Sequence, residues 1–261
     1  MSKIVVVYHS GYGHTKRIAE TVAESAGAQL IAIDAEGNLK DADWEALAAA
    51  DAIVFGSPTY MGAASWQFKK FADASSKPWY SQVWKDKLAA GFTNSATLNG
   101  DKFNTLTYLV TLSQQHSMFW VGSGMQAPNA KKHGRDDVNH LGGYTGLITA
   151  TPSDASAEEM VPGDIATGVA FGTASLEVLG GLALAFGLKA RWAAGALAFF
   201  TLLASFLFHN FWALPADQVM VNQLMFMKNL SVIGGLLMVV AFGAGPASVD
   251  ARFGARRPAH A

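Results

Sequence analysis

The sequence predicts an α/β domain with a parallel sheet, followed by an α-helical membrane region. Three observations lead to this prediction. Over the first two thirds of the chain, strand-length apolar runs alternate with amphipathic runs of helical length. The strand-length runs are apolar throughout, as is typical of strands buried on both faces. Beyond residue 168, the chain holds long apolar segments with few charges.

Composition divides the chain in the same place. Residues 1–167 carry 17 acidic and 13 basic side chains, a balance of −4, whereas residues 168–261 carry 3 and 6, a balance of +3. We therefore expect a soluble domain over 1–167, membrane helices over 168–245 and a basic tail over 246–261. The overall charge of −1 argues against a nucleic-acid partner. Cysteine is absent, so no disulfide or thiolate chemistry is available.

Five strands are predicted at 4–8, 29–33, 51–56, 87–93 and 117–121, with helices at 14–26, 43–49, 64–74 and 101–115. Alternating units of this kind form a parallel sheet through right-handed crossovers. In such a sheet, a ligand binds at the carboxyl ends of the strands, where the strand order reverses. In the order 2-1-3-4-5, one of the two common orders of such sheets, the turns after the first, third and fourth strands would converge on it.

The turn after the first strand has the composition of a phosphate site. A helix N-terminus offers unpaired backbone N–H groups and the positive end of the helix dipole, both of which favour a phosphate dianion. Glycines let the backbone close around the ligand, and hydroxyl side chains add donors. An ordinary strand-to-helix turn remains the alternative. The residues of this turn are Ser10, Gly11, Tyr12, Gly13, His14 and Thr15.

The other two turns also offer polar groups. In 57–62, Pro58 fixes one φ angle and Gly62 permits an unusual one, so the segment could hold a planar ring against its backbone N–H groups. A tight strand-to-helix turn would have the same sequence. The third turn runs over 93–100 and is polar at most of its positions.

The sequence Ser-Gly-Tyr-Gly-His-Thr resembles the phosphate loop of the WrbA-type flavodoxin-like quinone reductases, a resemblance that covers about residues 1–172. It implies a five-stranded parallel sheet in the order 2-1-3-4-5 and a bound FMN. The spacing is too long for a dinucleotide GxGxxG motif, and the lysine of a P-loop is missing. Pro-Thr-x-x-Gly over 58–62 matches the family's flavin loop, whereas Ala96, Leu98 and Asn99 depart from its glycine-rich third loop. The resemblance adds these cofactor-binding residues to the phosphate loop: Pro58, Thr59, Tyr60, Met61, Gly62, Thr93, Asn94, Ser95, Ala96 and Gly100.

Three further residues match positions of that family. His116 corresponds to a histidine near flavin and substrate, and is the predicted catalytic residue. Trp79 and Tyr12 correspond to residues that contact the substrate or the nicotinamide. A capping or core histidine, and buried core aromatic residues, would give the same pattern. The histidines lack metal-ligand spacing, so no metal site is predicted.

Apolar runs at 173–188, 192–214 and 224–243 predict membrane helices, in preference to buried core helices. Strings at 175–181, 208–212 and 226–230 resemble the DoxX membrane family over about 174–245, with that family's first helix absent. Asp164 is a candidate N-cap for a last flavodoxin-type helix that runs on into this region. Since intramembrane charges usually pair, we expect Glu177 to pair with Lys228.

The N-terminal segment and the basic residues indicate how the chain would be oriented in a membrane. The soluble domain has no signal peptide before its first strand, so we expect it to be cytoplasmic. Basic residues at 189–191 and 252–257 favour a membrane hairpin of two spans, which keeps both clusters inside, over three spans. His209 and Asn210 fit an interfacial position beside Trp212, or contact with a quinone head group.

These features predict an FMN-dependent NAD(P)H:quinone oxidoreductase tethered to the membrane. The resemblance implies hydride transfer from NADH or NADPH to the flavin, and then reduction of a quinone. Membrane lipid is an expected partner, and the related soluble family suggests a homo-oligomer. A flavodoxin-type electron carrier and a non-enzymatic membrane-complex subunit with a docking module are the alternatives. The modest charge of the soluble part argues against the carrier, because carriers tend to be strongly acidic.

Overall fold

The structure is a computed structural model that describes residues 3–254. Its contacts divide the chain into two compact units, Lys3–Leu176 and a second that begins at Glu177. The division falls nine residues later than the predicted boundary at 167/168, and lies inside one helix. The last part of the predicted basic tail, residues 255–261 with Arg256 and Arg257, lies outside the described residues.

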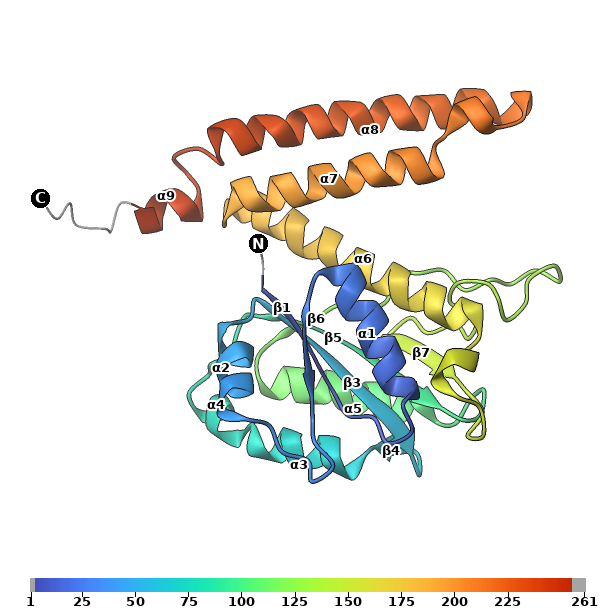
Figure 1. Ribbon diagram of the computed structural model, residues 1–261. Helices are drawn as coiled ribbons and strands as arrows, with labels where there is room; N and C mark the ends of the chain where they lie inside the picture. The colour runs from blue at the N-terminus through green and yellow to red at the C-terminus, as the bar shows by residue number, and fades with distance from the viewer. Residues whose placement is uncertain (1–2, 255–261) are drawn as a thin grey trace, which may run out of the picture. The chain divides into compact units, whose positions relative to one another are not determined.

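The first unit is built on a parallel sheet (Figure 1). Its strands β1 (Ile4–Tyr8), β2 (Gln29–Ala32), β3 (Ala52–Tyr60) and β5 (Leu88–Ser95) pair in the order β2-β1-β3-β5. A two-residue strand, β4 (Ala63–Ala64), turns back antiparallel on the end of β3. The predicted parallel sheet and its order are confirmed for these strands.

The fifth strand differs from the prediction because it is split. The short strand β6 (Phe119–Trp120) pairs with the start of β5, and β7 (Leu147–Ala150) pairs with its end. Residues 121–146 leave the sheet edge between the two pieces. The sequence did not predict β7 because its four residues stand alone in a stretch rich in glycine and polar residues.

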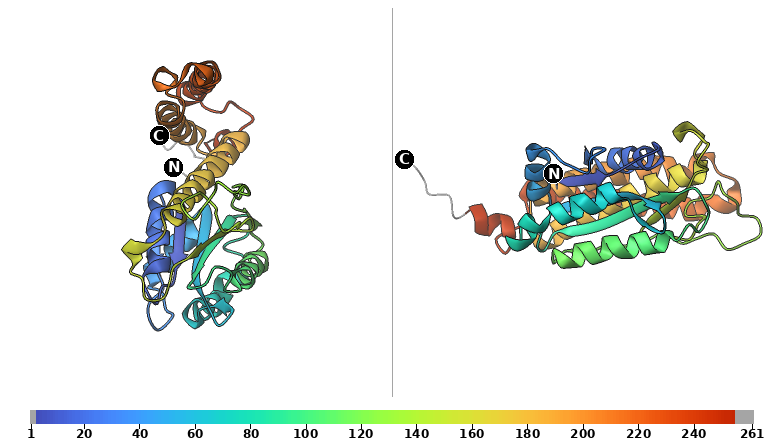
Figure 2. Two further views of the ribbon diagram at one scale, coloured as in Figure 1. Left: turned by 90° about the vertical axis from the view of Figure 1, so that its right-hand side faces the viewer. Right: turned by 90° about the horizontal axis from the view of Figure 1, so that it is seen from below.

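Helices cover both faces of the sheet (Figure 2). Side chains from α2 (Asp41–Ala49), α3 (Trp66–Ala74) and α5 (Lys102–Gln115) share one apolar core with alternate residues of the strands. A short helix, α4 (Ser76–Tyr80), follows α3. On the opposite face lies α1 (His14–Ala26), against which the start of α6 (Pro162–Phe186) packs at glycines. Parallel strands buried in this way explain why the apolar runs lack alternation.

Helix α6 begins at Pro162, and the predicted N-cap Asp164 is therefore wrong. Proline suits the first helical position because its fixed φ matches the helix and its missing N–H has no partner there. Asp164 lies in the first turn instead, and its Oδ2 accepts a hydrogen bond of 3.2 Å from the Ala150 N–H. This contact joins the helix start to the end of β7.

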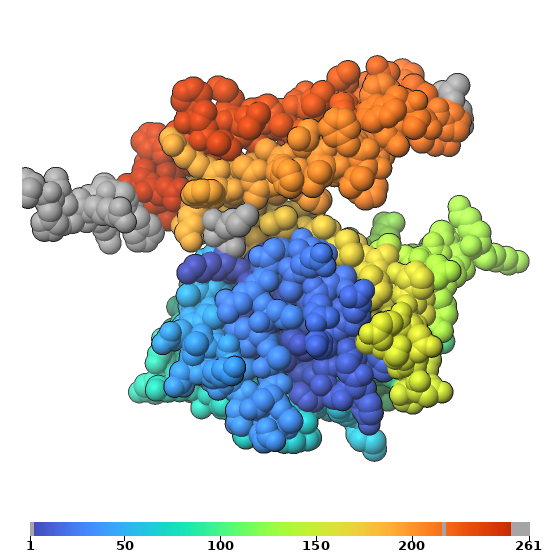
Figure 3. All heavy atoms as spheres, viewed as in Figure 1, coloured from blue at the N-terminus to red at the C-terminus, as the bar shows by residue number. Residues whose placement is uncertain are grey.

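The second unit contains the remaining helices α7 (Ala190–Phe208) and α8 (Ala216–Phe242), with a 3₁₀ turn at Phe211–Ala213 and a short α9 (Val249–Gly254). Three helical segments are long and apolar enough to cross a membrane, at Pro162–Phe186, Ala190–Ala213 and Gln218–Phe242. Their existence confirms the predicted apolar helices. Side chains of α7 and α8 lie against one another along their lengths (Figure 3).

The expected ion pair in this unit is not formed. Among the described residues, no salt bridge joins Glu177 to Lys228, and both side chains are exposed. The polar contact between α7 and α8 comes from neutral groups: Asn229 Nδ2 donates to Ser205 Oγ at 3.0 Å.

Candidate functional site

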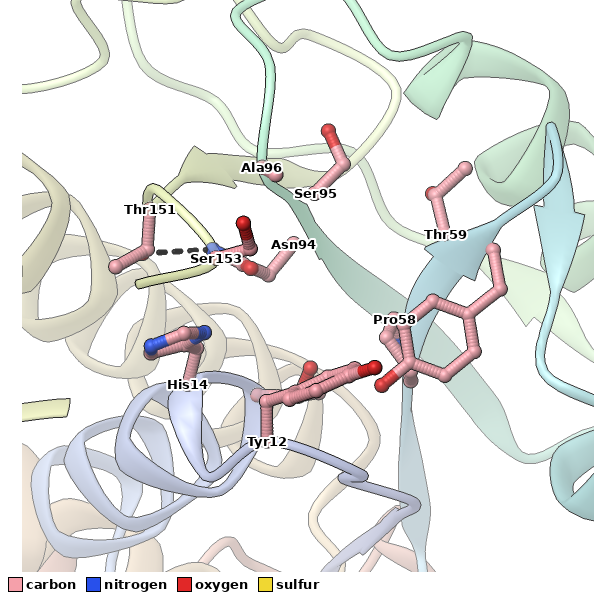
Figure 4. Close-up of a pocket in the computed structure, with 11 residues that line it drawn as sticks. Tyr12, His14, Pro58, Thr59, Asn94, Ser95, Ala96, Thr151 and Ser153 are labelled. Carbon is pink, nitrogen blue, oxygen red and sulfur yellow. Dashed lines mark hydrogen bonds between the residues drawn. The ribbon is translucent and has the colours of Figure 1, made fainter. Parts of the chain in front are cut away.

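A pocket of about 200 Å³ lies where four segments of the first unit meet (Figure 4). Three of them are the predicted turns, at the ends of β1, β3 and β5. The fourth follows β7. The lining residues are Tyr12, His14, Thr15, Pro58, Thr59, Tyr60, Asn94, Ser95, Ala96, Thr151 and Ser153.

The turn after β1 places a helix N-terminus at this pocket. Gly13 takes a φ of 92°, a left-handed conformation that glycine adopts readily, and α1 begins at the next residue. Ser10 Oγ accepts a hydrogen bond of 3.1 Å from the Gly13 N–H, which fixes the turn. The amides of the first helical turn lack intrahelical partners and form an anion site. Thr15 adds a hydroxyl in that turn.

Two tyrosines form an aromatic corner beside the same turn. The rings of Tyr12 and Tyr60 meet edge to face, with centroids 6.0 Å apart. Tyr12 is 72% exposed, so one ring lies open to a ligand. A methyl group at Gly11 would lie 2.5 Å from Tyr60 Oη, so a side chain there would displace the Tyr60 hydroxyl. Burial raises the pKa of the Tyr60 phenol, which therefore keeps its proton and remains a donor at neutral pH.

The second predicted segment is more regular than expected. Residues 57–60 were predicted as a turn, but β3 continues through them because Ser57 and Pro58 pair with β5. The turn itself is confined to Met61 and Gly62, with φ angles of 49° and 78°.

Hydroxyl groups tie this end of the sheet to α5. Thr59 Oγ1 lies 2.8 Å from both Thr93 Oγ1 and Thr105 Oγ1. All three threonines are buried. The network holds β3, β5 and α5 together directly beneath the pocket.

The fourth segment was not predicted. Asn94 Nδ2 donates to Thr149 Oγ1 at 2.8 Å and to Thr151 Oγ1 at 3.0 Å, which joins β5 to the end of β7. His14 Nε2 lies 2.8 Å from the Ala155 carbonyl oxygen and holds the following loop over α1. Thr151 and Ser153 could have been found by the pattern that predicted the other three segments, polar residues directly after an apolar strand, since both follow the short strand β7.

Lys102 is a second residue that the sequence analysis missed. Its side chain is fully buried, and Nζ donates to Ser95 Oγ at 2.8 Å and to the Thr97 carbonyl at 2.7 Å. These bonds stabilise the turn that ends at Gly100, where φ is 55°. Burial lowers the pKa of Lys102 to about 8.

Most predicted cofactor residues lie at this pocket or in the segments that form it. The lining includes nine of them, at positions 12, 14, 15, 58, 59, 60, 94, 95 and 96. The others shape the same backbone segments without lining the pocket: Ser10, Gly11, Gly13, Met61, Gly62, Thr93 and Gly100. Met61 is fully exposed.

Within one chain, His116 and Trp79 do not lie at this pocket, and their roles at flavin and substrate stay predictions. They line a separate cavity of about 310 Å³ near the carboxyl end of α5. His116 follows Thr105 by eleven residues, roughly 16 Å along a helix axis. It is buried, with Nε2 2.8 Å from Ser75 Oγ and its ring centroid 4.2 Å from that of Trp84. Burial lowers the pKa of His116 to about 4, so the ring is neutral at pH 7.

In the part of the chain described, no group of three or more histidine, aspartate or glutamate side chains is arranged to hold a metal ion. Of the polar residues singled out after α7, His209 contacts α8, with Nδ1 3.3 Å from Asn222 Oδ1. In the same unit, four aromatic rings form a cluster, those of Phe206, Phe211, Trp212 and Phe226.

Two protein-family models match separate parts of the chain. Residues 5–122 match the family described as flavodoxin domain. Residues 167–253, the region predicted to resemble DoxX proteins, match the SURF4 family.

Individual relatives cover the first unit. Flavodoxin FldP of Pseudomonas aeruginosa (strain UCBPP-PA14) is 52% identical over 167 residues, which are 64% of this chain and 91% of that protein. The NAD(P)H dehydrogenase (quinone) of Rhizobium rhizogenes is 30% identical over 60% of this chain and 87% of that protein. Among solved structures, a WrbA-like flavodoxin from Agrobacterium tumefaciens has 52% identity and a TM-score of 0.54, and covers 67% of this chain and 94% of that chain.

Proposed function

Because this chain belongs to the flavodoxin-like family, with WrbA-like and quinone-dehydrogenase relatives, we propose that it is an FMN-dependent NAD(P)H:quinone oxidoreductase attached to a membrane. The observation that carries the proposal is the pocket at the ends of β1, β3, β5 and β7. It combines a helix N-terminus, hydroxyl groups and an open aromatic ring within one site.

The donor set fits FMN. The first-turn amides of α1, with the hydroxyls of Ser10 and Thr15, would hold the phosphate. The backbone at the end of β3 and the turn at Met61 and Gly62 would border the flavin ring. Bound FMN would supply hydride acceptance from a nicotinamide and two-electron delivery to a quinone.

Side chains of this chain would bind, orient and shield the cofactor and the substrate. Tyr12 offers an exposed ring face against which a planar substrate can stack. Tyr60 stays protonated, so it can donate a hydrogen bond to an oxygen or nitrogen at the ring edge. The Thr59–Thr93–Thr105 network keeps β3 and β5 in register beneath the ring.

Attachment to the membrane would serve substrate access. Quinones with isoprenoid tails reside in lipid, and three helical segments of this chain are long and apolar enough to cross a bilayer. We place the flavin domain on the cytoplasmic side, where nicotinamide nucleotides are found. Protection of the first unit from protease in sealed inside-out vesicles would contradict this orientation.

A flavodoxin-type electron carrier is the second candidate. It is favoured by the 52% identical relative that is named a flavodoxin. The balance of −4 over residues 1–167 opposes it, since steering by a carrier relies on strong negative charge.

An anaerobic absorbance experiment tests the proposal. Detergent-purified protein should show a flavin band that bleaches within seconds after addition of NADPH or NADH. A band that persists would favour the carrier, and failure to bind FMN would refute both. Ser10→Ala/Thr15→Ala should weaken FMN binding more than riboflavin binding, because only FMN carries the phosphate. Thr107→Ala, an exposed hydroxyl on α5, is the matched control.

A further inference from the structure

Two charged side chains lie within the apolar helices of the second unit. Glu177 lies on α6, nine residues before its end, and Lys228 lies near the middle of α8. Both are exposed, and no ion pair between side chains that the structure describes involves either of them. Charged groups at membrane depth are costly unless they pair or line a polar path.

Neighbouring polar groups are already engaged elsewhere. Asn229 donates to Ser205, and Ser231 Oγ donates to the Met227 carbonyl of its own helix. His209 lies 3.3 Å from Asn222. Within one chain, these contacts leave Glu177 and Lys228 facing outward without a counter-charge.

Each charge stands on an open helix face that also carries small residues. Glu177 shares its face with Gly181 and Ala185, four and eight positions on, and Lys228 shares its face with Ser231 and Gly235. All are exposed, and a methyl group added at Gly181 or Gly235 would meet nothing within 4 Å. Small residues let two membrane helices approach closely.

The two charges also lie at comparable depth. The ends of α6 and α8 are neighbours, since a Cβ at Gly187, the residue after α6, would lie 3.0 Å from the Cβ of Ala244, two residues after α8. Counting back from these ends at about 1.5 Å per residue places Glu177 roughly 14 Å and Lys228 roughly 21 Å from them. The long lysine side chain can span that difference.

We propose that two copies of this chain associate in the membrane, with α6 of each copy packed on α8 of the other and Glu177 of each paired with Lys228 of the other. A twofold axis along the membrane normal makes the two contacts equivalent and keeps each pair at one depth. The occupant of the open faces is a second copy because the two faces carry opposite charges. This inference is independent of the flavin chemistry.

Reciprocal charge reversal tests it. Glu177→Lys expressed alone places two like-charged pairs in the dimer, and so does Lys228→Glu. Each should lose at least tenfold in the cross-linked dimer fraction in native membranes. Co-expression with two different tags should recover mixed dimers, because every contact then joins opposite charges. If Glu177 paired with Lys228 of its own chain, co-expression would not restore the cross-linked dimer fraction, and that result would overturn the proposal.

Cysteine cross-linking gives a second measurement that needs no charge change. The chain has no native cysteine. Differently tagged copies with Gly181→Cys and Ser231→Cys should form a disulfide-linked heterodimer. Leu230→Cys, exposed at the same depth on another face of α8, is the matched control and should not. Equal cross-linking from both positions, or none from Ser231→Cys, would contradict the proposal. Equal helical circular dichroism of the purified variants shows that each has folded.

Discussion

At the scale of single residues, the shape of the candidate pocket depends on positions that carry no side chain. Gly11 is the clearest case, because a methyl group there would lie 2.5 Å from Tyr60 Oη and 3.4 Å from Tyr60 Cζ. We predict that Gly11→Ala lowers FMN affinity about tenfold, which corresponds to about 1.4 kcal/mol. Fluorescence-quenching titration of the apoprotein with FMN would measure this.

A second substitution, Tyr60→Phe, removes the hydroxyl group that a methyl group at position 11 would meet. In Gly11→Ala/Tyr60→Phe, the nearest ring carbon lies at ordinary contact distance, so the double variant should bind FMN about as tightly as Tyr60→Phe alone. Gly134→Ala is the control, since nothing lies within 4 Å of a methyl group there. Unchanged affinity in Gly11→Ala, or a double variant that binds FMN much more weakly than Tyr60→Phe, would show that the two side chains do not compete.

His116 gives a residue-scale prediction about pH. Ser75 Oγ donates to the Ala72 carbonyl at 2.6 Å, so the His116 Nε2–H must donate to Ser75, while Nδ1 has no partner. The folded pKa is about 4 against 6.5 in the unfolded chain. The unfolded chain therefore binds a proton at higher pH than the folded one. Stability should be lost as pH falls from about 6.5 to 4, by up to roughly 3 kcal/mol.

Thermal melting between pH 4 and 7, followed by circular dichroism, measures this loss. His116→Gln keeps a donor for Ser75 but does not titrate, so its stability should fall less steeply over the same range. Thr107→Ala, which removes an exposed hydroxyl on α5 that does not titrate, should keep the wild-type slope. FMN affinity should be unchanged in both variants, because neither residue lines the pocket.

The residues that could be predicted share a simple physical cause. Tyr12, Thr59 and Asn94 lie at or just beyond the carboxyl ends of long apolar strands, and parallel strands end at one edge of a sheet. Lys102 was missed because its role depends on burial beneath a turn. The role of His116 stays a prediction, because a resemblance gives a position in the chain and α5 carries that position away from the pocket of the same chain.

At the scale of elements, the ends of the strands depend on their pairing partners in the sheet, which cannot be identified from the sequence. β3 extends to Tyr60 because β5 continues beside it. The edge strand is divided because residues 121–146 leave the sheet and β7 completes the pairing. Apolar periodicity predicts which segments are strands, but pairing decides where they end.

The contact between α6 and α1 is an element-scale feature that can be tested at one glycine. A methyl group at Gly172 would lie 2.7 Å from Ser25 Cβ and 2.8 Å from the Val22 carbonyl oxygen. We predict that Gly172→Ala destabilises the first unit by about 1–3 kcal/mol, because the backbone of α1 must move. Gly181→Ala on the same helix meets no neighbour and should be neutral or slightly stabilising. Equal melting temperatures for the two variants would contradict this packing.

At the scale of the whole molecule, the chain joins a flavodoxin-like unit to apolar helices through α6 itself. The boundary between the units falls between Leu176 and Glu177, inside that helix, so no separate linker connects them. Hydropathy revealed both parts from the sequence. It did not reveal the unpaired charges on α6 and α8, since pairing is a property of the folded helices.

If the chain acts on a quinone dissolved in lipid, its rate should follow the mole fraction of that quinone in the bilayer. In proteoliposomes with fixed protein and fixed total quinone, doubling the lipid halves this mole fraction. We predict that oxidation of NADPH or NADH then falls about twofold with a long-tailed quinone below saturation, because rate is proportional to local substrate concentration in that range.

A water-soluble short quinone is the matched control, and its rate should not change with added lipid. The flavin band and its bleaching under anaerobic conditions show that the protein in each sample is loaded and competent. Rates with the long-tailed quinone that ignore the amount of lipid would mean that the substrate reaches the pocket from water, and that the apolar helices serve attachment alone.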